Sequence, residues 1–274
     1  TIHGNIGATN ATSNFTISEW NSLTLASNVS TFNSDNMTLS DNTVLNFGNV
    51  TSGYNRGSSE TLTFASNITM GSNSTINVGN GTTLNGNIYG TAGTLNVLGN
   101  FTSTGSIGAA QVDGADFITS KLEQINISEG NTFTLNTNAT ATNMDINGTV
   151  TATGNITASV TLGANGILTL NTENTYDDNA PKVVGTIQSG TIDQNYGTLN
   201  INGTFTTQGA IGQGGRGLAA INLSNSTNFA TGFTTTFAHS VNATTITIGT
   251  SNSQTNSTLA VSTSDITITG NIAG

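Results

Sequence analysis

Apolar and polar residues alternate with a period of two along most of this chain. The alternation is regular in residues 61–64, 132–135 and 266–268. A strand with one buried face requires this period, because successive side chains point to opposite sides of the backbone. Clusters of Gly, Asn and Ser interrupt the runs every few residues, as turns do. The best helical pattern, in residues 117–125, covers little more than two turns, so the sequence predicts an all-β protein.

The composition agrees with an ordered β protein. The 274 residues include 53 Thr, 40 Asn and 27 Ser but one Pro, and only 7% are charged. Disordered chains are instead rich in Pro and charge and poor in β-branched residues. We therefore expect a folded chain whose outward strand positions carry Thr, Asn and Ser.

The chain contains internal repeats. Residues 93–108 and 197–212 are identical at ten of sixteen positions without a gap. The similarity continues with small slips, in which Leu122, Ile125, Asn126 and Ser128 correspond to Leu218, Ile221, Asn222 and Ser224. A shorter motif, Gly-x-Ile, begins at Gly4, Gly86, Gly185 and Gly270. These repeats predict about three degenerate copies of one unit of 82–99 residues, over residues 1–85, 86–184 and 185–274.

Repeated short strands with little helix are typical of a β-solenoid, a propeller or tandem β-sandwiches. The period and signature of a propeller blade, about 40–50 residues, are not found in this chain, while tandem sandwiches of about 100 residues remain an alternative. Very short strands and small slips between copies favour the solenoid. We expect one continuous domain over residues 1–274, a parallel β-helix with roughly 20–25 residues per coil and uncapped ends.

The segment 197–212, with the sequence GTLNINGTFTTQGAIG, resembles the passenger repeats of bacterial autotransporter surface antigens, above all those of the rickettsial outer-membrane protein B type. The resemblance covers residues 84–274 and lies in composition and loose motif. It implies a secreted β-helix on a cell surface that mediates adhesion or forms a coat, and it brings no catalytic residues with it. The chain is then expected to be a processed passenger, a fragment of one, or a secreted subunit that shares the solenoid architecture.

Charge and residue types argue against several functions. With four Lys and Arg against 14 Asp and Glu, the net charge of −10 opposes nucleic-acid binding. No apolar run approaches the roughly 18–20 residues that span a bilayer, and there is no Cys for a thiolate metal site. We expect no enzymatic activity and no cofactor, with Ca²⁺ as the one candidate metal ion.

The candidate Ca²⁺ site consists of Glu173, Asp177, Asp178 and Asn179. Carboxylate and amide oxygens are the ligands that Ca²⁺ prefers. Their spacing matches neither an EF-hand nor a Gly-rich nonapeptide repeat, so a solvated loop is the alternative interpretation.

The N-glycosylation motif Asn-x-Ser/Thr occurs 18 times. It marks the surface of a secreted protein, but strand alternation also produces it. The candidate acceptors are Asn28, Asn67, Asn100, Asn155 and Asn242.

The two ends of the chain favour self-assembly. Gly-x-Ile motifs lie at both ends, and few charges there block the pairing of strand edges. We expect copies to stack head to tail as a cell-surface or filament subunit. The residues expected at this contact are Ile2, Gly4, Asn5, Ile6, Ile268, Gly270, Asn271 and Ile272.

Two other functions remain open from the sequence. An adhesin passenger would bind a host glycan or protein through its lateral face. The aromatic side chains available for that purpose are Trp20, Tyr54, Tyr89, Tyr176 and Tyr196. An ice-binding or polysaccharide-active β-helix is the third interpretation. Thr-x-Thr pairs such as 61/63 and 132/134 favour ice binding, and their unequal spacing opposes it. Polysaccharide cleavage would need paired carboxylates or a basic residue beside them, and the chain has only four basic residues.

Overall fold

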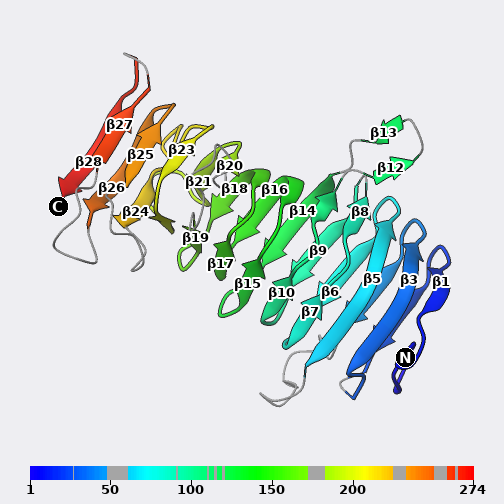
Figure 1. The fold of residues 1–274 in the computed structure, drawn as a ribbon. Coiled ribbons are helices and arrows are strands. Elements are labelled where there is room, and N and C mark those ends of the chain that lie inside the picture. The colour runs from blue at the N-terminus through cyan, green and yellow to red at the C-terminus, as the bar shows by residue number, and fades with distance from the viewer. Residues whose placement is uncertain are drawn as a thin grey trace. The chain divides into compact units, whose positions relative to one another are not determined.

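A computed structural model describes residues 1–26, 28–47, 61–90, 92–109, 111–113, 116–118, 121–171, 183–224, 233–249, 258–262 and 265–274. In these residues the regular structure consists of short strands that stack in parallel, apart from one antiparallel hairpin (Figure 1). The chain divides into two compact units, Thr1–Asn143 and Met144–Gly274. The all-β prediction is confirmed, and so is the β-solenoid.

One ladder of parallel strands in the first unit has a strand from each successive coil. It consists of β2 (Ser22–Leu25), β4 (Val44–Phe47), β6 (Thr75–Val78), β9 (Thr94–Val97) and β14 (Leu122–Ile127). Each strand pairs with the next in regular register. Residues that pair across successive strands form what we call a column.

The other ladder of the first unit begins with three longer strands, β1 (Thr12–Ile17), β3 (Thr31–Leu39) and β5 (Leu62–Met70). After β5 it divides into two. Its first half continues in β7 (Thr82–Leu84), β10 (Phe101–Ser103) and β15 (Thr132–Leu135). Its second half continues in β8 (Ile88–Gly90), β11 (Ile107–Ala109) and β16 (Ala139–Ile146). The hairpin is β12 (Gln111–Asp113) with β13 (Asp116–Ile118).

The second unit also has parallel ladders. The longest runs through β17 (Thr149–Ala152), β19 (Ile167–Asn171), β22 (Thr198–Asn202), β24 (Leu218–Ser224), β26 (Val241–Ile248) and β28 (Ile268–Ala273). A second joins β18 (Ile156–Leu162) to β20 (Val183–Val184) and β21 (Ile187–Ser189). A third joins β23 (Phe205–Thr207), β25 (Thr234–Phe237) and β27 (Thr258–Val261).

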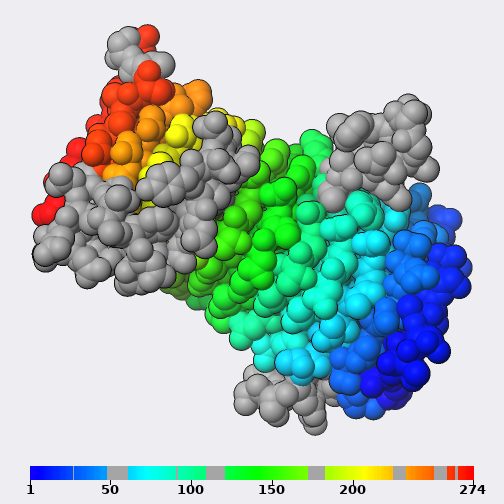
Figure 2. Space-filling view, viewed as in Figure 1, coloured from blue at the N-terminus to red at the C-terminus, as the bar shows by residue number. Residues whose placement is uncertain are grey.

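Inward-facing apolar columns form the core, and the coils of the first unit follow one another as bands from blue to green (Figure 2). The rings of Phe32 and Phe64 stack with centroids 4.7 Å apart, and Phe47 lies 4.6 Å from Phe64. Phe101 and Phe133 stack in the same way at 5.1 Å. Rings therefore stack between some neighbouring coils, and aliphatic side chains such as Leu84 continue the columns elsewhere, so the core is a stack of side chains rather than a central cluster.

Coil length varies more than the sequence predicts. Leu45 pairs with Ile76, 31 residues further along, and Ile76 pairs with Leu95 after only 19 residues. The register within the ladder stays regular across both steps. The differences in length therefore fall in the connections between strands, where they do not disturb the columns.

The Gly-x-Ile motif marks a place where successive coils approach closely. A Cβ on Gly105 would lie 2.0 Å from the carbonyl oxygen of Gly86, and a Cβ on Gly209 would lie 1.7 Å from that of Gly185. Such distances are far inside van der Waals contact, so only glycine fits. The 104-residue repeat is thus a repeat of the same inter-coil contact.

Candidate functional site

The last coil leaves core positions exposed. Ile272 on β28 pairs with Ile246, which pairs with Ile221. Ile221 and Ile246 are fully buried, whereas Ile272 is 57% exposed. Val261 on β27 is 50% exposed although it pairs with the buried Phe237. The inward columns therefore end in an apolar surface at the last coil.

The start of the first coil is joined to its neighbour by two isolated bridges and by side-chain hydrogen bonds. Ile2 forms a parallel bridge to Leu25, and Ile6 forms one to Phe32. The Oδ1 atom of Asn5 accepts hydrogen bonds from the backbone N–H groups of Ser30 at 2.8 Å and Thr31 at 3.1 Å. Ile2 and Ile6 are half-buried, and Gly4 and Asn5 are exposed.

The terminal Gly-x-Ile motifs do not occupy the same positions as the internal copies, and the head-to-tail contact stays a prediction. Ile88 lies in the column of Ile68, but Ile6 lies in the column of Phe32. Ile272 lies in the ladder of β22, β24 and β26 and not in that of β21, which carries the third copy. A three-residue motif recurs in different columns because strand alternation and turn glycines generate it in each of them.

Asparagine side chains form a ladder on the outer side of the first unit. The Nδ2 atoms of Asn77, Asn96 and Asn126 each donate to the Oδ1 atom of the asparagine one coil earlier, at 2.8 Å in every case, and the ladder starts at Asn46. In the second unit Asn222 donates to Asn200 at 2.9 Å. These amides satisfy one another, and they join successive coils in the same direction.

Threonines form a second type of column. Thr31, Thr63, Thr83, Thr102 and Thr134 pair in register from β3 to β15. All five side chains are half-buried on the outer face. Among the described residues, none of their hydroxyls has a hydrogen-bond partner in the protein. This column cannot be recognised in the sequence, because its successive threonines are separated by 19 to 32 residues.

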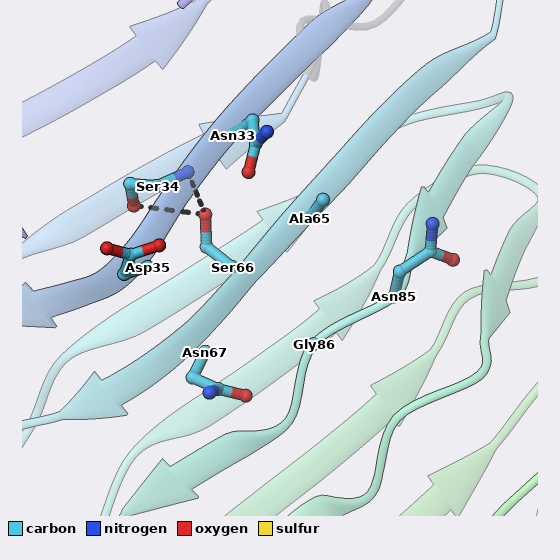
Figure 3. Close-up of a pocket in the computed structure, with 8 residues that line it drawn as sticks. All are labelled: Asn33, Ser34, Asp35, Ala65, Ser66, Asn67, Asn85 and Gly86. Carbon is cyan, nitrogen blue, oxygen red and sulfur yellow. Dashed lines mark hydrogen bonds between the residues drawn. The ribbon is translucent and has the colours of Figure 1, made fainter. Parts of the chain in front are cut away.

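A polar hollow of about 300 Å³ lies beside the threonine column, between β3, β5 and the segment that carries Asn85 and Gly86 (Figure 3). Its lining residues are Asn33, Ser34, Asp35, Ala65, Ser66, Asn67, Asn85 and Gly86. Ser34 and Ser66 are buried and form its floor. The Ser34 N–H donates to the Ser66 hydroxyl at 2.8 Å, and the two hydroxyl oxygens are 3.0 Å apart. Sequence reasoning missed this hollow, because no motif marks it.

Several of the site residues that the sequence predicts lie outside the described part of the chain. The candidate Ca²⁺ ligands Glu173, Asp177, Asp178 and Asn179 lie outside the described residues, and so do Tyr54 and Tyr176. Within the described ranges, no group of three or more His, Asp or Glu side chains is placed to hold a metal ion. No helix in the described part of the chain is long and apolar enough to cross a membrane.

The candidate glycosylation acceptors differ in their contacts. Asn28 is exposed, and its Nδ2 atom donates to the carbonyl oxygen of His3. Asn67 and Asn100 accept through Oδ1 from the backbone N–H groups of Asn87 and Thr132, both at 3.0 Å. Asn155 and Asn242 are half-buried. Glycosylation of these five residues stays a prediction.

The described aromatic candidates also differ in exposure. Trp20 is 76% exposed and adopts a positive φ of 61°. Tyr89 is half-buried, and its hydroxyl accepts a hydrogen bond from Asn87 Nδ2 at 3.0 Å. Tyr196 is half-buried as well, and its hydroxyl donates to Gln194. Only Trp20 therefore presents a largely free aromatic surface among these three.

Comparison with known proteins finds no matching family, no matching curated protein and no matching solved structure.

Proposed function

We propose that this protein is an extracellular, non-enzymatic structural protein whose copies stack end to end. The observation that carries the proposal is the exposure of core columns at the last coil. Ile272 and Val261 are 57% and 50% exposed, while the residues that precede them in their columns are fully buried. Burial of this apolar surface against another coil would be favourable.

The proposed partner is the first coil of a second copy. That coil presents its own half-buried column residues, Ile2, Ile6 and Phe15, to the end of the stack. Strand β28 pairs with β26 in parallel, so an added parallel strand would continue the pattern of the ladder. The sequences of β1 and β28, TSNFTI and ITGNIA, contain no charged residue that would oppose such pairing.

A contact between two different ends of the same chain does not close on itself. It generates a linear assembly in which each copy adds to the end of the previous one. The parallel ladders provide the geometry for this growth. Each coil pairs with the next one through the edges of parallel strands, and an added copy would pair in the same way. The resemblance to passenger repeats of bacterial surface antigens supports the extracellular location.

The experiment is sedimentation velocity and negative-stain electron microscopy of residues 1–274 over a range of concentrations. We expect rods that lengthen as concentration rises. The variant Ile272→Lys places a charge in the proposed contact and should prevent growth. The control is Ile192→Lys, which changes a side chain that is also 57% exposed but lies between β21 and β22. A chain that stays monomeric at every concentration would refute the proposal, and so would equal effects of the two variants.

A second candidate is an adhesin-type binding protein, which Trp20 favours. A bulky residue at positive φ is strained by roughly 1–2 kcal/mol, and Trp20 nevertheless combines that conformation with 76% exposure. Strain of this kind is often retained where a side chain contacts a ligand. The test is whether Trp20→Ala lowers adhesion of the protein to host cells or extracellular matrix, with Leu98→Ala, at another exposed apolar residue, as control.

A further inference from the structure

The outer surface of the first unit carries two kinds of polar column that differ in what they offer a ligand. The asparagine ladder uses its amides within the protein, at 2.8 Å per step. The hydroxyls of the threonine column have no such partner among the described residues, and each offers one donor and two acceptor positions. The threonines recur at the coil spacing, about 4.8 Å. Of these two columns, it is therefore the threonine column that offers unused hydrogen-bonding groups at regular intervals.

The polar hollow arises from two local departures from regular pairing. Asn33 pairs with Ala65, and Asn36 pairs with Asn67, so β3 contains one residue more than β5 over this stretch. This extra residue makes a β-bulge, a feature that redirects side chains and is frequent beside functional sites. One coil later the chain turns inward at Gly86, whose Cβ would lie 1.8 Å from the carbonyl oxygen of Ser66. The bulged strand and Gly86 border the hollow on two of its sides (Figure 3).

The rim of the hollow combines a carboxylate with amide groups. Asp35 and Asn85 are exposed, and Asn33 and Asn67 are half-buried. Asn67 and Asn85 accept hydrogen bonds through Oδ1 only, from the Asn87 N–H and from the Thr104 hydroxyl at 3.0 Å each. Their Nδ2 groups have no partner among the described residues. The rim thus offers amide donors beside one carboxylate acceptor.

This set of groups fits a neutral ligand rich in hydroxyl groups. A single carboxylate cannot supply the 6–8 oxygen ligands of Ca²⁺, and a chain of net charge −10 with four basic residues repels polyanions. Hydroxyl groups of a sugar can donate to Asp35 and accept from the amides. The hollow is shallow and open, with a volume of about 300 Å³, which suits one sugar unit that stays partly in solvent rather than a large molecule.

We propose that the polar hollow and the adjoining threonine column bind a neutral linear polysaccharide. One sugar unit occupies the hollow, and the adjoining units lie along Thr31, Thr63 and Thr83, which precede the lining residues Asn33, Ala65 and Asn85 by two positions on the same face. The rim contains no aromatic ring, so a single unit binds weakly. Affinity comes from repetition, because linked units that engage neighbouring positions raise the effective concentration of one another. This inference gives a ligand class to the adhesin candidate and is independent of end-to-end stacking.

The experiment measures co-sedimentation of residues 1–274 with particulate cellulose, chitin, β-1,3-glucan and mannan, and compares dextran sulfate in affinity electrophoresis. We expect retention by at least one neutral polymer and none by dextran sulfate. Ala65→Trp fills the hollow from its outer face and should weaken binding about tenfold, as the loss of one or two net hydrogen bonds would. Asp35→Asn and Thr63→Val should each weaken it by a smaller factor. Unchanged circular dichroism and thermal midpoint establish that these variants are folded.

Matched controls make the result specific to the face. Thr94→Trp introduces the same bulk on the outer side of β9, and Glu19→Gln removes the same charge from an exposed turn; neither should alter retention. The proposal is overturned if no neutral polymer retains the protein, if Ala65→Trp and Thr94→Trp bind equally, or if the protein shapes ice crystals without binding any polymer. Loss of polymer binding with filament growth intact would separate this site from the stacking contact.

Discussion

The side-chain amide of Asn96 donates from Nδ2 to the Oδ1 atom of Asn77 over 2.8 Å. Its own Oδ1 accepts from Asn126 at the same distance. Asn77 and Asn96 are therefore each both donor and acceptor between coils, and the ladder is continuous over four coils of the first unit. Amide ladders of this kind add side-chain bonds to the backbone bonds of stacked parallel strands.

Removal of one amide should break two bonds at once. We predict that Asn96→Ala lowers the free energy of unfolding by about 1–3 kcal/mol, because it leaves a donor on Asn126 and an acceptor on Asn77 without their partners. Asn96→Asp should cost more, because a carboxylate cannot donate to the Asn77 oxygen and repels it. Denaturant titration measures both. Thr94→Ala, on the same strand and outer face, is the control, and an equal loss for all three variants would contradict this role of the ladder.

The close approach at Gly105 should make that position intolerant of any side chain. We predict that Gly105→Ala and Gly209→Ala both destabilise the protein by about 1–3 kcal/mol, because the new Cβ overpacks the contact with the preceding coil. Thermal unfolding of the two variants gives the measurement. Gly249→Ala is the control, since no described residue lies within 4 Å of the position that its Cβ would occupy. Similar midpoints for all three variants would show that the contact relaxes freely.

The contacts between phenylalanine rings predict that Phe→Leu substitutions differ in their effect on the free energy of unfolding. Phe64 contacts the rings of both Phe32 and Phe47, whereas Phe133, among the described residues, contacts the ring of Phe101 alone. Phe64→Leu should therefore cost more than Phe133→Leu, by about 0.5–1.5 kcal/mol, the contribution of one further ring pair. Chemical denaturation of both variants measures the difference. The reverse order would mean that the remaining side chains repack around position 64.

The positive φ of Trp20 should lower the free energy of unfolding, while its exposed ring is available for contact with a partner. It lies two residues before β2, as Asn42 and Asn73 lie two residues before β4 and β6, and all three have positive φ. Asparagine tolerates this conformation better than tryptophan. We predict that Trp20→Asn raises the free energy of unfolding by about 0.5–1 kcal/mol and lowers adhesion. Asn42→Trp should have the opposite effect on stability, and a loss of stability in Trp20→Asn would mean that the indole ring packs favourably in its turn.

Much of the fold follows from local features of the sequence. Alternation places Leu45, Ile76 and Leu95 inward, and turn residues divide the chain into short strands. The 104-residue repeat correctly indicates that residues 93–108 and 197–212 make the same contacts, and their glycines approach the preceding coil in the same way. These features are readable because each depends on residues that are near one another in the chain.

The surfaces of functional interest depend on which residues face one another across coils, and only the tertiary structure decides that. Thr31, Thr63 and Thr83 come into one column although unequal lengths of chain separate them, while the similar motifs at Gly4 and Gly86 fall into different columns. The bulge at β3 and the glycine at position 86 create a hollow without any motif. The alternating pattern of the sequence by itself determined which side chains point inward. The register between coils was decided by how connections of unequal length close each turn, a property of the whole coil and not of any local segment.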